Sequence, residues 1–83
     1  MKADILRRIL EERKKQDDKW GEQNHHPTYW LSILGEEYGE LCKAINETIN
    51  CGDKKGSHKE IVKEAIQVAA VVVAMIECIE RNK

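Results

Sequence analysis

Apolar residues recur at intervals of three and four along most of the chain, the spacing that lines one face of an α-helix. The first such stretch predicts a helix from about Ala3 to about Asp18, with charged residues between its apolar positions. The second predicts a longer helix that begins at Pro27, a residue suited to the first helical turn, and ends near Asn50. No segment has the period of two that is typical of a strand, so the pattern predicts an all-α fold.

A turn and a capping signal introduce a third helix. The polar segment 51–56 indicates the turn, and Gly52 within it is expected to end the second helix. Ser57 and Glu60 then form the S-x-x-E capping box of a helix that runs to about Glu80. All 83 residues are expected to form a single domain, a helical hairpin with an additional N-terminal helix.

The third predicted helix lacks the polar face that surface helices keep. Between Ala65 and Ile76, Gln67 is its only polar residue. A chain this short buries only about 60% of its unfolded surface, so a partner is expected to cover the remainder. We therefore expect a homodimer or tetramer, in which the second and third helices of two protomers form a four-helix bundle across the interface.

Charge and composition limit which kinds of partner and which cellular compartment are expected. A formal net charge of −1 provides no positive field for nucleic acid or an anionic membrane surface. Three cysteines without C-x-x-C spacing suit a reduced compartment. The apolar part of the third helix is shorter than the roughly 18–20 residues that cross a bilayer, and the charged N-terminus does not resemble a signal peptide. A cytoplasmic protein without nucleic acid or membrane partners is expected.

Three glutamates share one face of the second helix. Glu36, Glu37 and Glu40 project within an arc of about 100°. Like charges at this spacing repel one another, which favours a counter-ion. Mg²⁺ is the first candidate because it binds one or two carboxylates together with water and phosphate oxygens. A solvated acidic stripe is the alternative explanation.

Two features favour a site over a solvated stripe. Gly39 costs about 0.5–1 kcal/mol relative to alanine inside a helix, which suggests that a close neighbour or a ligand needs the space. The third helix offers a second polar set, Glu60, Glu64 and Gln67, within about 60° of one another. Antiparallel helices can present both sets across one cleft, as in the carboxylate metal sites of helical bundles.

The ordered acidic residues resemble the E-E-x-x-E, spacer, E-x-x-D signature of the MazG-like all-α nucleoside triphosphate pyrophosphohydrolases. The flanking segments KWGEQNHHP and EAIQVAAVVVAMIE are similar to those of short, phage-type members, and the resemblance covers about residues 17–80. It implies an enzyme of nucleotide-pool house-cleaning that hydrolyses a (deoxy)nucleoside triphosphate to the monophosphate and pyrophosphate. Such enzymes are Mg²⁺-dependent homo-oligomers, and Mn²⁺ is expected to substitute.

The resemblance also implies roles for the acidic residues. Glu37, Glu40 and Glu64 match metal-binding carboxylates, and Glu36 is expected to orient or activate the attacking water. Gln67 stands where the family usually has aspartate, and an amide offers a metal one oxygen but no charge. The alternative is therefore a catalytically weakened or inactive helical module of the same fold, which binds nucleotide or mediates oligomerisation.

The aromatic segment before the second helix is the candidate base-recognition wall. An aromatic ring would stack on the nucleobase, and amide or imidazole groups would read its edge. The resemblance places substrate contacts in this segment, which offers Lys19, Trp20, Gln23, His25 and His26, with Trp20 and His26 foremost. Lys55, in the polar turn, is expected to reach triphosphate oxygens.

Several other candidates have simpler explanations. Tyr29 and Trp30 lie on the second helix and are expected to be core or interface anchors. Zinc is disfavoured because adjacent histidines rarely make a tetrahedral site. The basic residues of the first helix, Lys15 among them, alternate with acidic ones and predict a solvated face, and Lys63 is likewise expected to be solvated.

The apolar third helix yields the first testable prediction. We expect an obligate dimer or tetramer, because one chain cannot cover a helix that is apolar on nearly every side. Light scattering at micromolar protein concentration measures the mass directly. A monomer under those conditions would rule out this inference.

Overall fold

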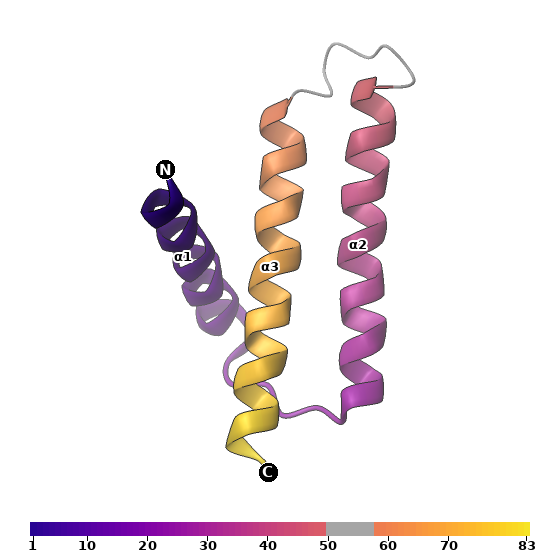
Figure 1. The fold of residues 1–83 in the computed structure, drawn as a ribbon. Helices are drawn as coiled ribbons and strands as arrows, with labels where there is room; N and C mark the ends of the chain where they lie inside the picture. Colours follow the sequence, from indigo (N-terminus) through magenta and orange to yellow (C-terminus); the bar gives the residue numbers. More distant parts are fainter. Residues whose placement is uncertain (50–57) are drawn as a thin grey trace.

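The computed structural model describes residues 1–49 and 58–83, which form three helices. They are α1 (Lys2–Trp20), α2 (Pro27–Ile49) and α3 (His58–Arg81), shown in Figure 1. The described ranges contain no strand. The predicted all-α fold and the three helices are thus confirmed, with α1 slightly longer at both ends than predicted. The predicted stop at Gly52, the turn 51–56 and the cap at Ser57 lie outside the described residues.

Local sequence explains where α1 ends and α2 begins. Gly21 has a φ of 74°, and its N–H donates to the Asp17 carbonyl at 2.8 Å. A side chain at this φ would be strained, so glycine suits the end of α1. At the start of α2, the backbone N–H of Thr28 donates to Nδ1 of His26 at 3.2 Å. The His26 ring therefore satisfies one of the free N–H groups of the first turn.

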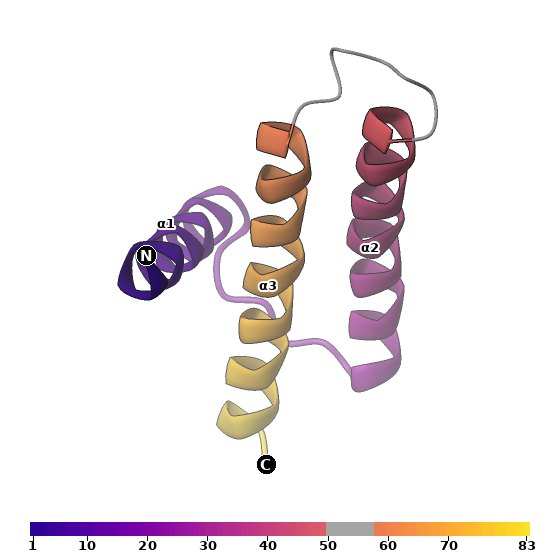
Figure 2. The same ribbon diagram turned by 45° about the horizontal axis from the view of Figure 1, so that its top comes forward.

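The helix α3 lies between the other two. It forms an antiparallel hairpin with α2 and packs against α1 on another side (Figure 2). Among the described residues, no Cα atom of α1 lies within 8 Å of one in α2. The two outer helices are therefore held together through α3 and the connector between them.

The core lies where α2 begins and α3 ends. Trp30 is 1% exposed and packs with Val71, Ala74 and Cys78, and no residue of α1 is buried. Trp30 is confirmed as a core anchor. Tyr29, predicted to be a core or interface anchor, is 56% exposed in the single chain and lies outside the core. A core this small leaves much of the apolar surface of the chain uncovered.

Large apolar side chains remain exposed on all three helices, including Leu6 and Leu10 on α1. On α2 they include Leu31, Tyr38 and Ile45, and on α3 they include Ile76 and Ile79. Packing of α1 and α2 on α3 thus does not cover all the apolar surface of the hairpin. Within the ranges described, none of the helices combines the length and hydropathy that crossing a bilayer requires.

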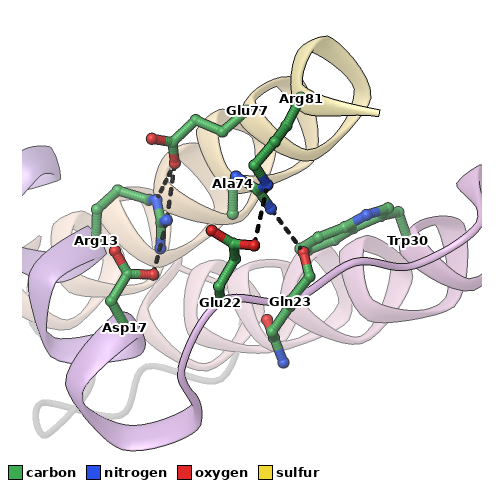
Figure 3. A pocket seen from close by; sticks show the side chains of 8 residues that line it. All are labelled: Arg13, Asp17, Glu22, Gln23, Trp30, Ala74, Glu77 and Arg81. Atoms are coloured by element: carbon green, nitrogen blue, oxygen red, sulfur yellow. Dashed lines mark hydrogen bonds and ion pairs between the residues drawn. The ribbon is translucent and has the colours of Figure 1, made fainter. Parts of the chain in front are cut away.

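Two arginines fasten α1 and the connector to α3, as Figure 3 shows. The Arg13 side chain is only 13% exposed, and its Nη2 lies 2.7 Å from a Glu77 oxygen on α3 and 2.9 Å from an Asp17 oxygen on α1. Arg81 donates to the Gln23 carbonyl at 3.0 Å. The Cys78 thiol adds a contact to the His25 carbonyl at 3.5 Å. These bonds set the position of α1 relative to the hairpin.

We predict that Arg13→Ala loosens α1, because the change removes the ion pair that joins α1 to α3. The expected loss is about 1 kcal/mol, a fall in Tm of roughly 4–8 °C for a chain of this size. Arg7→Ala is the matched control, since Arg7 pairs with Asp4 and Glu11 on the exposed face of α1 itself. That change should cost less than about 0.5 kcal/mol. Equal Tm values for both variants in thermal unfolding would contradict the role of Arg13.

Candidate functional site

The surface between α1 and α2 is hollowed into two adjoining pockets. The charged pocket, about 520 Å³, is lined by Glu12, Lys15, Gln16, Lys19, Trp20, Glu37, Lys63 and Gln67. The aromatic pocket, about 390 Å³, is lined by Gln16, Trp20, Gln23, His25, Tyr29, Trp30, Ile33, Glu36, Glu37 and Val71. Gln16, Trp20 and Glu37 line both pockets, so the two adjoin, and we refer to them together as the groove. The groove follows from the fold, because α1 and α2 flank α3 with no Cα atom of one within 8 Å of the other among the described residues.

Glu37 lies at the junction of the two pockets and is the focus of the negative charge. It is half-buried, and desolvation raises the pKa of its carboxyl above the ordinary value. The charges of Glu64, Glu40, Glu12 and Glu36 raise this pKa further, in that order of size. Carboxylates from all three helices thus act on one side chain. The predicted approach of the two acidic sets is supported by the interaction of Glu37 on α2 with Glu64 on α3.

The donor chemistry around Glu37 suits a hard divalent cation. Carboxylate oxygens are the ligands that Mg²⁺ prefers, and one or two suffice when water and phosphate complete its shell. Gln67, half-buried on α3, lines the same pocket as Glu37 and can offer a neutral oxygen. In residues 1–49 and 58–83, no three acidic, histidine or cysteine side chains are already gathered closely enough to hold a metal. A cation would therefore bind with fewer protein ligands or draw the carboxylates together.

The remaining predicted acidic residues differ in their positions. Glu36 is exposed and lines the aromatic pocket beside Glu37. Glu40 is exposed and lines neither pocket. Its charge nevertheless raises the pKa of Glu37. A Cβ atom added at Gly39 would meet nothing within 4 Å among the described atoms. The close neighbour predicted at Gly39 is therefore not supplied by the described part of the same chain.

The predicted base-recognition residues divide into two groups. Trp20 and Gln23 line the aromatic pocket, and Lys19 and Trp20 line the charged one. His26 lines neither pocket and instead caps α2. Lys55 lies outside the described residues.

His25 is the imidazole that lines the aromatic pocket. Its ring packs at a centroid distance of 4.5 Å from Tyr29 and edge-on at 5.1 Å from Trp30. Its Nε2 is buried and has no hydrogen-bond partner among the described residues. A buried polar atom without a partner costs free energy, which a ligand with a complementary group would recover.

Sequence reasoning named Lys19 and Trp20 at the end of α1 but missed the residues that the preceding turns of α1 contribute to the groove. Glu12 raises the pKa of Glu37, and Lys15 and Gln16 line the charged pocket. Lys63, predicted only to be solvated, is exposed and lines the same pocket. The residues of α1 recur at intervals of three and four, which marks one helix face, but that spacing does not tell which helix the face opposes.

Comparisons with protein-family models, curated proteins and solved structures found no match to this chain. The chemistry of the groove is therefore interpreted from its own residues.

The raised pKa of Glu37 predicts a specific pH dependence of stability. Between the ordinary pKa of 4.5 and the raised value, the folded state binds more protons at Glu37 than the unfolded state does. Its contribution to stability therefore falls as the pH rises through the raised pKa. Glu37→Gln should raise the Tm of the protein in EDTA at about pH 7, and this gain should vanish below about pH 4.5.

Circular dichroism during thermal unfolding over this pH range provides the measurement. Glu47→Gln is the matched control, because Glu47 is exposed on the same helix and lines neither pocket. It should leave the Tm unchanged. An equal Tm for Glu37→Gln and the wild type at neutral pH would show that ionised Glu37 does not destabilise the folded state.

Proposed function

We propose that this chain is an Mg²⁺-dependent pyrophosphohydrolase of (deoxy)nucleoside triphosphates, similar to the MazG-like all-α enzymes. One observation carries the proposal: carboxylates from three helices converge on Glu37, which lines both a charged and an aromatic pocket. A nucleotide has the same two-part chemistry, an anionic phosphate chain joined to a planar base. The groove therefore matches both ends of one ligand.

The aromatic pocket suits a nucleobase. Trp20 and Tyr29 offer exposed rings on which a planar base can stack. Gln16 and Gln23 bring carboxamides, each with donor and acceptor groups, to the same pocket. The unpartnered Nε2 of His25 adds a further polar group for the base edge. These side chains would hold the base and thereby orient the phosphate chain towards Glu37.

The acidic residues have distinct roles in the proposed reaction. Glu37 and Glu64, which interact across α2 and α3, would hold the cation together with Glu40 and the Gln67 oxygen. When bound, Mg²⁺ neutralises phosphate charge and lowers the pKa of coordinated water. Glu36 is exposed and lines the aromatic pocket beside Glu37. It would accept the proton of the water that attacks the α-phosphorus. Hydrolysis then releases the nucleoside monophosphate and pyrophosphate.

The proposed enzyme is a homodimer or a tetramer. Leu31, Tyr38 and Ile45 on α2 and Ile76 and Ile79 on α3 leave apolar surface exposed on the hairpin. A second hairpin packed on this surface would complete a four-helix bundle. This arrangement would also supply the close neighbour that Gly39 lacks in the described part of a single chain.

A second function is supported by Gln67. It lines the charged pocket with a neutral amide, whereas the signature of the resembled family has a carboxylate there. Loss of one charge reduces affinity for a divalent cation. The alternative is therefore a nucleotide-binding or oligomerisation module that keeps the groove but has lost turnover.

The main prediction is release of pyrophosphate from a panel of dNTPs and NTPs with Mg²⁺ or Mn²⁺. Glu40→Gln should lower the metal-dependent rate at least about 100-fold while leaving the far-ultraviolet circular dichroism unchanged, because Glu40 is an exposed charge outside the core. Glu47→Gln, also exposed on α2, should retain the full rate. Full activity of Glu40→Gln would contradict the metal assignment.

Gln67→Asp separates the two candidate functions. Restoring a carboxylate should lower the Mg²⁺ concentration that gives half of the maximal rate, because the added charge strengthens cation binding. If neither the wild type nor Gln67→Asp releases pyrophosphate from any nucleotide, yet both bind nucleotides in calorimetric titration, the binding module is the better description.

A further inference from the structure

We infer that Lys15, Lys19 and Lys63 form a clamp for the polyphosphate chain of the ligand, which makes the groove selective for triphosphates over monophosphates. This inference rests on the proposed function and assigns the phosphate chain to one of the two pockets. It adds residues of α1 and α3 that the acidic signature does not contain.

The distribution of charge between the two pockets determines which pocket would take the phosphate chain and which the base. The charged pocket is lined by three lysines, Lys15, Lys19 and Lys63, against two carboxylates, Glu12 and Glu37, which leaves an excess of positive charge. The aromatic pocket has no lysine or arginine in its lining and has Glu36 and Glu37 instead. A polyanion is therefore attracted to the charged pocket and repelled from the aromatic one. The base then occupies the aromatic pocket, and the reacting phosphate lies near Glu37, which lines both.

Trp20 supports the same direction. The Nζ atom of Lys19 lies 4.7 Å from the centroid of the Trp20 ring, a cation–π contact that holds the ammonium over this ring. Lys19 lines only the charged pocket, whereas Trp20 lines both pockets. The ring thus has the ammonium on the side of the charged pocket and remains available to a base on the side of the aromatic pocket.

The lysines at the groove are free to bind an anion. Neither Lys15 nor Lys63 makes an ion pair among the described residues, whereas Arg13 and Arg81 are engaged with carboxylates. An ammonium group without a partner gains a charge-assisted hydrogen bond when a phosphate oxygen arrives and gives up none. Because the lysines come from two helices, a longer phosphate chain can contact more of them at once.

Binding of inorganic tripolyphosphate tests the clamp without requiring turnover or a base. Isothermal titration calorimetry with Mg²⁺ at physiological salt should show roughly tenfold weaker binding for Lys15→Gln and for Lys63→Gln, and a larger loss for the double variant. Lys14→Gln and Lys43→Gln are the matched controls, because both lysines are exposed and line neither pocket. They should change the affinity less than twofold.

A parallel titration with the triphosphate and the monophosphate of one nucleoside tests selectivity. The two clamp variants should weaken triphosphate binding about as much as tripolyphosphate binding and leave monophosphate binding within twofold. Unchanged tripolyphosphate affinity in the double variant, or equal losses in the Lys14 and Lys43 controls, would overturn the clamp. Absence of pyrophosphate release from every nucleotide, with lysine-dependent tripolyphosphate binding retained, would instead refute the proposed hydrolase and leave the clamp standing.

Discussion

Burial of α3 is the constraint on which the rest of the structure depends. Its middle is apolar on nearly every side, so it needs cover from more than one direction. The chain provides α2 on one side and α1 on another. Because the described backbones of these two helices stay apart, a groove forms between them. Apolar side chains also remain exposed on α2 and α3. The proposed assembly and the groove would therefore have one physical origin.

The carboxylates in the groove oppose folding, and a bound ligand of opposite charge would offset that cost. Partly buried Glu37 is surrounded by other carboxylates, and its raised pKa records the cost of ionising it there. A folded chain tolerates such a cost when a ligand that relieves it is bound. The lysines on the facing side of the charged pocket provide the opposite charge without neutralising Glu37 through an ion pair among the described residues. Cation and polyanion would thus be attracted to adjacent positions.

Helix periodicity predicted the fold well and the site in part. The three helices follow from local spacing, the glycine after α1 and the proline at the start of α2, all of which act within a few residues. The interaction of Glu37 with Glu64 was foreseen, because two acidic faces on the helices of a hairpin are expected to meet. The sequence predicted that Lys19 and Trp20 of α1 lie at the site, but it assigned Glu12 and Lys15 to a solvated face. Of the adjacent histidines, His26 caps a helix and His25 lines a pocket, a distinction that depends on the path of the connector.

The sequence by itself determined which residues share a face of each helix, because a period of 3.6 residues sets the angle between side chains around a single axis. It therefore specified the acidic face of α2, the apolar character of α3 and the mixed charges of α1. Only the tertiary structure decided which of these faces meet. The rotation and crossing of separate helices are set by long-range contacts, here the packing of Trp30 against α3 and the ion pair of Arg13 with Glu77. Those contacts turn α1 so that its lysines line the pocket that contains Glu37.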